Sequence, residues 1–500
     1  MRRPRLGWIA GASASAMLLL VVSCSLGLDE SKINEGTEAG AIDTGSPEET
    51  SVDAGDGGTN PTGPDGGTCS KDDECPTGGN ACLKGRCDLT AKRCIYDVCR
   101  PSACNVGACD PAAKTCGTPK TYLYKVTQFP VGLPVQRVVA VYPWLFVLTQ
   151  SGVTAFNISN PFGAMPNTAP PSTPVFGIGF APTQMVATEN RVFFLSAPTG
   201  PANLPSRLPI AWLDVPTDPL TTRLDAKNAV VTYSRAASEP VSMAARENDT
   251  ALLFGAPAQN IPSAIVQPPL VEPTTLTATP ITFTAGLNLA AISGERLLFQ
   301  QIDGNGSTTF GLVKGAGSTS PMNAGTYSYA DAGPYGGPQA FAASADGALY
   351  WQISSFTASP ATIDPPGFQT RAVRGHFLFA NGTADYDRPA TFDVEVYAPV
   401  QGAPFMAGPA AMLDNETAMV LTAAKENIGA QTAVQFVKKN PLGVLKNADG
   451  MTPRRSVLAV PVNTFAGAAA AGGLGFAVAN ESMPGPNATV YVFDPNCPTQ

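Results

Sequence analysis

The sequence predicts an all-β protein: a seven-bladed β-propeller that follows a small disulfide-rich module and a disordered tether. Three observations lead to this prediction. Strand-forming segments recur in clusters from residue 121 onward, nine cysteines crowd into residues 69–117, and the stretch before them has no periodic apolar pattern. Glycine (49) and proline (47) are frequent, and charged residues are 14% of the chain, against about 25% in typical soluble domains. Such a composition suits many short strands joined by turns.

Residues 1–23 have the layout of an export signal. Basic residues between Arg2 and Arg5 precede an apolar run that ends in Val21-Val22-Ser23-Cys24. This motif resembles a bacterial lipobox with Val where Leu is usual, which implies cleavage before Cys24 and attachment of lipid to Cys24. Acyl chains, at about 0.8 kcal/mol per buried CH₂, would anchor the mature protein to a membrane. By resemblance to other lipoproteins, Ser25 favours the outer membrane; the alternative is an ordinary signal peptide in which Cys24 has no role.

Residues 24–68 consist of the anchor cysteine and a tether. From Ser25 to Thr68 the chain is rich in Gly, Thr, Pro, Ser, Asp and Glu, so it cannot bury enough apolar surface to offset the entropy of ordering it. A flexible chain of this length spans roughly 35–40 Å by square-root scaling. We expect this tether to hold the folded part away from the membrane.

Residues 69–117 form a cysteine module. Its nine cysteines and Cys497 are the ten that we expect in disulfides: Cys69, Cys75, Cys82, Cys87, Cys94, Cys99, Cys104, Cys109, Cys116 and Cys497. The oxidising compartment that an exported chain enters favours disulfides over zinc thiolates, and the chain has a single histidine to offer a metal. Because nine is odd, Cys497 should pair with a module cysteine, and we expect that partner to be Cys116.

The module also repeats itself. The segment from Gly85-Arg86-Cys87 to Cys94 matches the segment from Gly107-Ala108-Cys109 to Cys116, and each copy predicts a small hairpin bounded by cysteines. The module resembles the small Cys-rich modules of bacterial surface lipoproteins and, more loosely, Dickkopf-type or EGF-like knots. This resemblance rests on cysteine spacing and implies no particular ligand.

Residues 118–500 contain seven clusters of three strand-forming segments. The second segments of the clusters begin at Trp144, Arg191, Thr250, Arg296, Ala348, Thr417 and Leu474. Their spacing, roughly 46 to 70 residues, is that of propeller blades with some long loops. A candidate fourth strand follows every cluster except the last, so we expect Tyr122 to Thr127 to supply it and close the ring. The alternative fold is a pair of tandem β-sandwiches, which would also yield many short strands.

The first cluster ends in Asn157-Ile158-Ser159-Asn160-Pro161, which resembles the end of a blade in the LVIVD-type repeat family. The second and seventh clusters depart from this motif, with Leu213-Asp214-Val215-Pro216 and Val492-Phe493-Asp494-Pro495 in the corresponding places. The resemblance implies a propeller blade and names no ligand.

Three segments invite a chemical interpretation, and each has a simpler structural one. Asp303-Gly304-Asn305-Gly306-Ser307 resembles the start of a calcium loop, but Lys314 stands where an EF-hand needs Glu, and a tight hairpin turn explains the glycines. Ser344-Ala345-Asp346-Gly347 resembles the Asp-box turn of sialidase-like propellers with its glycine one place early. His376 lies in a strand-like run, where a lone histidine is usually structural. We therefore predict no catalytic residue, no metal and no cofactor.

The net charge of -8 argues against a nucleic-acid partner, because phosphate binding needs a basic surface. The sequence favours an exported lipoprotein, anchored to the cell envelope by its lipid, whose loop-rich propeller binds a protein or a glycan. Two alternatives stay open. One is an enzyme acting on polysaccharide, which would gather carboxylates in the central funnel; the other is a purely structural envelope protein.

Overall fold

The computed structural model describes residues 69–497 apart from segments between the strands, and between residues 276 and 407 it describes the strands by their backbone alone. The export signal and tether predicted for residues 1–68, including Cys24, lie outside the described residues. The regular secondary structure of the described part consists of β-strands and two one-turn 3₁₀ helices, η1 (Asp72–Glu74) and η2 (Val462–Thr464). No helix in this part is long and apolar enough to cross a bilayer.

The cysteine module is built from short antiparallel pairs of strands. These are β1 (Leu83–Asp88) with β2 (Arg93–Val98), β3 (Asn105–Val106) with β6 (Lys120–Thr121), and β4 (Cys109–Asp110) with β5 (Thr115–Cys116). The two hairpins predicted from the internal repeat are therefore present, with Cys87 opposite Cys94 and Cys109 opposite Cys116. In the second hairpin the Asp110 carboxylate accepts the backbone N–H groups of the next turn, which closes it.

Seven sheets of four or five strands follow in the described part of the chain, and each corresponds to one predicted cluster. Sheet 1 contains β8 (Val135–Val141), β9 (Trp144–Thr149), β10 (Gly152–Asn157), β11 (Ser172–Phe176) and β15 (Leu224–Asp225). Sheet 2 contains β12 (Gln184–Ala187), β13 (Arg191–Leu195), β14 (Pro205–Asp214), β16 (Lys227–Ala236) and β20 (Thr274–Leu276). Sheet 3 contains β17 (Val241–Arg246), β18 (Thr250–Gly255), β19 (Asn260–Val266) and β21 (Thr279–Thr282).

The remaining four sheets continue the same order. Sheet 4 contains β22 (Leu287–Ser293), β23 (Arg296–Ile302), β24 (Thr308–Lys314) and β25 (Met322–Tyr329). Sheet 5 contains β26 (Pro338–Ala343), β27 (Leu349–Ala358), β28 (Gln369–Leu378) and β29 (Ala390–Val394). Sheet 6 contains β30 (Ala407–Met412), β31 (Thr417–Ala423) and β32 (Thr432–Lys438), with β33 (Gly443–Val444) and β34 (Arg455–Leu458) both paired to β32. Sheet 7 contains β35 (Phe465–Ala471), β36 (Leu474–Glu481), β37 (Asn487–Phe493) and β7 (Lys125–Pro130).

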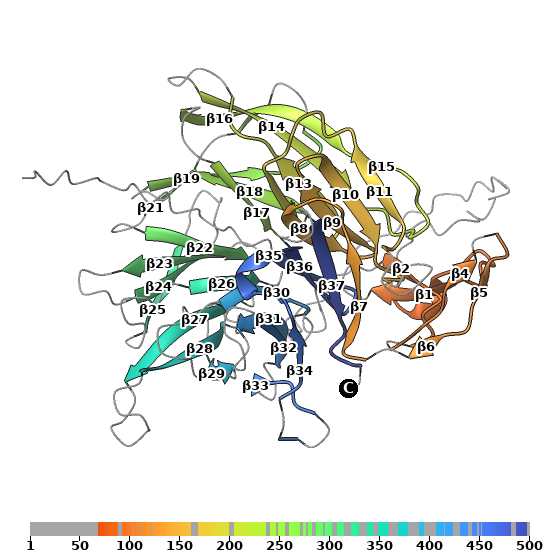
Figure 1. Cartoon of the computed structure of the whole chain (residues 1–500). Coiled ribbons are helices and arrows are strands. Elements are labelled where there is room, and N and C mark those ends of the chain that lie inside the picture. Colours follow the sequence, from red (N-terminus) through yellow and green to blue (C-terminus); the bar gives the residue numbers. More distant parts are fainter. Residues whose placement is uncertain are drawn as a thin grey trace, which may run out of the picture.

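The first strands of the seven sheets form a ring. Each contacts the first strand of the next sheet, and β35 of sheet 7 contacts β8 of sheet 1. In Figure 1 the sheets radiate outward from these first strands. This arrangement is that of a β-propeller, and two tandem β-sandwiches do not describe it.

The outer edges of sheets 1 and 2 are each covered by a short strand that lies in a connection between strands of the next sheet. The connection between β14 and β16 carries β15, which pairs in parallel with β11 of sheet 1. Likewise β20, between β19 and β21, pairs in parallel with β16 of sheet 2. Because an unpaired edge is a template for aggregation, these additions protect the rim of the ring.

Sheet 7 takes its outer strand from the other end of the chain, as the sequence predicted, but the strand begins three residues later. We expected Tyr122 to Thr127, whereas β7 runs from Lys125 to Pro130 and pairs antiparallel with β37. The reason is that Tyr124 fills space between sheets 6 and 7, with its ring 5.3 Å from that of Phe436. Phe129 is the aromatic residue of the strand itself, and it is buried between sheets 7 and 1.

Apolar side chains pack between neighbouring sheets. One cluster lies between sheets 7 and 1, others between sheets 1 and 2 and between sheets 2 and 3, and another between sheets 6 and 7. The cluster between sheets 7 and 1 also includes Ile95 and Val106 from the cysteine module, which are 4% and 3% exposed. The module and the ring therefore share a core between sheets 7 and 1.

Candidate functional site

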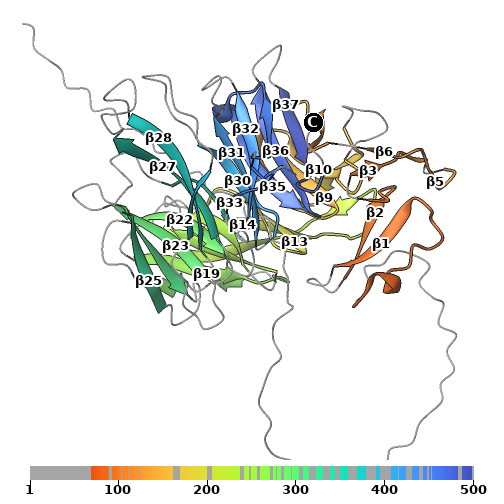
Figure 2. The same ribbon diagram turned by 90° about the horizontal axis from the view of Figure 1, so that it is seen from below.

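The cysteine module lies against one face of the ring, next to sheets 7, 1 and 2. Figures 1 and 2 show β1 and β2 beside this part of the ring from two directions. The ring contributes the turns that follow β8 and β12 and the residues that follow β10 and β37. We call this contact region the junction, and it is where the polar side chains of both parts meet.

Tyr142, in the turn after β8, reaches into the module. Its hydroxyl donates a short hydrogen bond to Asp97, and the Arg86 guanidinium pairs with the same carboxylate at 2.6 Å. The Arg86 guanidinium carbon also lies 5.8 Å from the centre of the Tyr142 ring. Burial, reinforced by Asp97, raises the pKa of Tyr142 well above its ordinary value, so its hydroxyl stays protonated and keeps donating.

The Tyr142 ring occupies space that only a glycine leaves open. Gly472, in the turn after β35 of sheet 7, has a φ of +60°, and a Cβ added there would overlap the ring. Its neighbour Gly473 has a φ of +79° with nothing within 4 Å of an added Cβ. The turn of sheet 7 is thus shaped to receive an aromatic side chain from sheet 1.

The motif Asn157-Ile158-Ser159-Asn160-Pro161 holds the module to sheet 1. The Asn157 side chain accepts the N–H of Ser159 at 3.0 Å and its hydroxyl at 2.6 Å, which fixes the turn. That turn presents Asn160, whose amide donates to the Gly107 carbonyl in the module at 2.7 Å. The segment that resembles a repeat signature therefore serves as a docking element here.

On the sheet 7 side, the module is joined by a buried ion pair. Arg100 of the module lies 2.7 Å from Asp494, with side chains that are 8% and 1% exposed. The Asn496 N–H donates to the same carboxylate at 2.9 Å. Burial raises the pKa of Asp494 above the usual 3.8, although Asn496 and Arg100 act in the opposite direction.

Five disulfides pair the ten predicted cysteines: Cys69–Cys87, Cys75–Cys94, Cys82–Cys109, Cys99–Cys116 and Cys104–Cys497. The C-terminus is bonded to the module, but through Cys104 and not, as we expected, through Cys116. Cys116 belongs to the β4–β5 hairpin, which Figure 1 shows at the end of the module away from the C-terminus. Cys104 lies just before β3, four residues from the Arg100 that binds Asp494.

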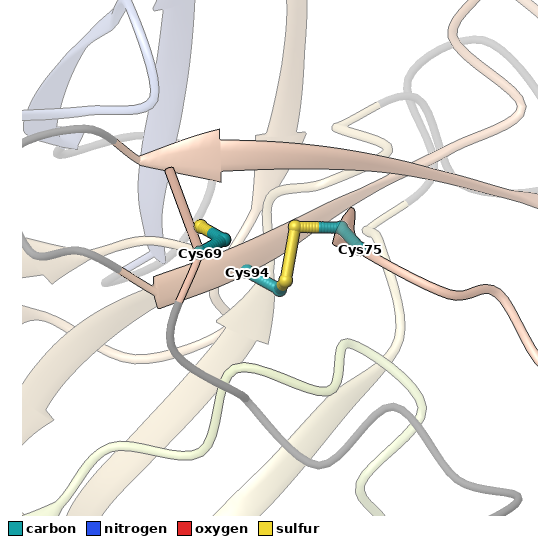
Figure 3. Close-up of side chains that lie close together, drawn as sticks. All are labelled: Cys69, Cys75 and Cys94. Carbon is teal, nitrogen blue, oxygen red and sulfur yellow. A yellow bond between two sulfur atoms is a disulfide. The ribbon is translucent and has the colours of Figure 1, made fainter. Parts of the chain in front are cut away.

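Two groups of three cysteine sulfurs lie close together, each within 4.8 Å: Cys69, Cys75 and Cys94, and Cys82, Cys99 and Cys116. Figure 3 shows the first group, in which Cys69 lies beside the Cys75–Cys94 bond. Every one of these sulfurs is already bonded to another sulfur. The grouping arises because two disulfides stack at each hairpin, and a bonded sulfur offers no thiolate to a metal.

The remaining predicted sites lie apart from the junction or outside the description. His376 belongs to β28, opposite Trp351 of β27 and Thr391 of β29. Residues 303–307 and 344–348, with the candidate calcium loop and Asp-box turn, lie outside the described residues, as does Cys24. The sequence reasoning missed the polar residues of the junction, because their partners lie far away along the chain, as Asp494 does from Arg100.

The first strands of the seven sheets carry no acidic residue. Their sequences, from VQRVVAV in β8 to FAGAAAA in β35, contain neither Asp nor Glu. Glycosidases need a pair of carboxyl groups on either side of the bond that they cleave. These strands, which surround the centre of the ring, do not supply such a pair.

No protein-family model matches the chain, and no curated protein matches its sequence. Among solved structures it is similar to the β-propeller domain of the Trilobed protease from Pyrococcus furiosus, described as having an open velcro topology, with 7% identity over 74% of this chain and 97% of that one and a TM-score of 0.39. It is also similar to prolyl endopeptidases, with 14% identity over 62% of this chain and 41% of that one and a TM-score of 0.32. The β-propeller domain of Myceliophteria thermophila Cps50 (Swd1) matches with 10% identity over 62% of this chain and 98% of that one, at a TM-score of 0.28. With likeness this distant, it is the sheet order and the ring of first strands that identify a β-propeller domain, preceded by a disulfide-rich module.

Proposed function

We propose that the chain is an exported, lipid-anchored protein that holds a seven-bladed β-propeller at the cell envelope, where the propeller binds a protein or a glycan. The lipid on Cys24 would attach the protein to the membrane, and residues 25–68 would act as a spacer. The propeller then presents a rigid disc with many loops, a common scaffold for recognition.

The observation that carries the export part is the state of the cysteines. All ten cysteines in the described part of the chain are disulfide-bonded. Disulfides of this density persist in exported proteins and are rare where the thiol pool is reduced. The N-terminal signal pattern and the lipobox-like motif support the same compartment and add the anchor.

Binding is favoured over polysaccharide cleavage by the composition of the first strands. A catalytic funnel would require converging carboxylates, and the seven first strands contribute none. The residues of the first strands are mainly apolar, and many are small, as in the four consecutive alanines of β35. We therefore place recognition ahead of catalysis.

The anchor is tested by labelling cells with a palmitate analogue and separating membranes from soluble protein. Wild type and a tether control, Ser31→Ala, should carry the label and sediment with membranes. Cys24→Ala should lose the label and leave the membrane fraction. A Cys24→Ala protein that keeps the label would exclude lipid attachment at this residue.

The binding role is tested with the soluble full-length Cys24→Ala chain on glycan arrays and by cross-linking at the cell surface. Saturable capture of one glycan class or one protein supports the proposal. Release of reducing ends from an added polysaccharide would instead establish the enzyme alternative. If the protein captures no glycan or protein and cleaves no polysaccharide, the structural role is the remaining alternative.

A further inference from the structure

The seam between sheet 7 and sheet 1 is where the two ends of the chain meet. On its sheet 7 side, β7 pairs with β37, so the first and last strands of the ring are hydrogen-bonded to each other. Across the seam, the Asn480 amide accepts the Val135 N–H at 2.8 Å and donates to the Val135 carbonyl at 2.9 Å. The chain runs directly from β7 into β8, so the part of this closure that contacts alone must hold is the pairing of β7 with β37.

The cysteine module is attached to both sides of this seam. On the sheet 7 side it holds Asp494 through Arg100 and Cys497 through the disulfide of Cys104. On the sheet 1 side it holds Tyr142 through Asp97 and receives the Asn160 amide on Gly107. A rigid body bonded to both partners opposes their separation.

The module also fills the seam from within. Ile95 and Val106 belong to the same apolar cluster as Phe129 of β7 and Val490 of β37. Separating sheet 7 from sheet 1 would therefore expose module side chains as well as those of the ring. Because burial of apolar side chains stabilises the closed arrangement, Ile95 and Val106 oppose opening of the seam.

We propose that the module holds the ring closed, and that it does so once Cys104 and Cys497 are oxidised to a disulfide. We call this disulfide the lock. The bond closes a loop with a sequence separation of 393, whereas the other four disulfides have separations of 17 to 27 and lie within the module. Those four shape the module, and the fifth is the one disulfide of the five that bonds the module to the segment after β37, beside the Arg100–Asp494 ion pair. With the lock open, β7 and β37 lose protection while sheets 2 and 3 keep theirs.

The chemistry needs an oxidant of the disulfide class. The Cys104 and Cys497 thiols give up two protons and two electrons, their sulfurs become bonded, and the oxidant leaves as a dithiol. A dithiol reductant runs the same exchange backward: its thiolate attacks one sulfur and releases the other cysteine as thiolate, and its second thiol then attacks the mixed disulfide, which frees the first cysteine and leaves the reductant as a disulfide. Closure of the ring is thereby tied to the redox state around the protein.

The test is hydrogen–deuterium exchange read by mass spectrometry on three full-length proteins: wild type, Cys104→Ser/Cys497→Ser, and the control Cys99→Ser/Cys116→Ser. Opening the lock should speed exchange in β7 and β37 at least about tenfold and leave β13 and β18 unchanged, because amide exchange reports local opening. The control removes a disulfide with a sequence separation of 17 that lies within the module. It should speed amide exchange in the module more than in β37. Equal protection of β7 and β37 in wild type and in the lock variant would overturn the proposal.

A second measurement covers the case in which the lock variant does not fold. Wild-type protein is titrated with dithiothreitol and alkylated. The molecules that carry the alkyl group on Cys104 and Cys497 alone are then taken through exchange and digestion. Faster exchange in β7 and β37 of those molecules supports the lock. Unchanged protection there, or a loss of protection spread evenly over sheets 2 and 3, contradicts it.

Discussion

Removing the Asn480 side chain should weaken the seam between sheets 7 and 1. Asn480, at the end of β36, makes both of its hydrogen bonds to Val135, the first residue of β8. One amide thus imitates the pairing that a neighbouring strand would give. Asn480→Ala would leave the N–H and the carbonyl of Val135 without these partners, and Val135 is only 3% exposed.

The magnitude follows from those two groups. A buried backbone group without a partner costs about 1–3 kcal/mol, and water can reach this half-buried site in part. We expect Asn480→Ala to lower the free energy of unfolding by about 2–4 kcal/mol, measured by urea denaturation at an unchanged m-value. Gln184→Ala should show a similar loss, since the Gln184 amide makes the same two-bond contact from sheet 2 to Val241 and Met243 of sheet 3.

The matched control is Asn228→Ala. The Asn228 amide makes one exposed hydrogen bond, to the Gly177 carbonyl at 2.7 Å, so its removal should stay within about 0.5 kcal/mol of wild type. An Asn480→Ala protein no less stable than Asn228→Ala would refute the idea that side-chain amides hold adjacent sheets together. Exchange rates at Val135 would then also be unchanged.

Three further changes probe the core and the junction. Gln435 is 0% exposed and its amide has no partner among the described residues, so Gln435→Met should raise the unfolding free energy by about 1–3 kcal/mol, whereas Gln184→Met should lower it. Gly472→Ala should destabilise by several kcal/mol more than Gly473→Ala in thermal melts, because both strain a positive φ and only the first overlaps Tyr142. Burial raises the pKa of Asp494 above 3.8, so the folded state keeps the Asp494 proton to a higher pH than the unfolded state does. The free energy of unfolding of wild type should therefore fall relative to that of Asp494→Asn as the pH rises from 3.8 toward neutrality. A difference in unfolding free energy between the two proteins that is the same at all pH values would contradict this.

The strands of the ring could be predicted because each sheet encodes itself locally. In sheet 1, β-branched and aromatic residues alternate with Pro143 and Gly152 at the turns, and nothing distant is needed to define β8, β9 or β10. Closure was predictable for a similar reason, since the last cluster lacked a fourth strand. The register of β7 was not, because Tyr124 and Phe129 look equally suited to a strand and only the space between sheets 6 and 7 distinguishes them.

The junction could not be predicted from the sequence. Arg100 and Asp494 are 394 residues apart, and neither has a neighbour that marks it as half of an ion pair. The partner of Cys497 depends on which part of the module faces the C-terminal strand, and distance along the chain is a poor guide to that. Cys116 is nearest in sequence, yet its hairpin lies at the far side of the module, and the β15 and β20 additions likewise come from connections with no strand pattern of their own.

The order of the disulfides along the chain has a consequence for how the protein matures. Eight of the nine module cysteines pair among themselves, and every one of their partners has been made once Cys116 has been translated. Cys104 is the one that must wait, because its partner stands 393 residues later. The β7 strand waits as well, since β37 is the last strand of the ring to be made. The last covalent bond and the last sheet are therefore completed by the same few C-terminal residues, and a chain that stops short of them has an unpaired thiol, an unpaired strand and an open seam at one place.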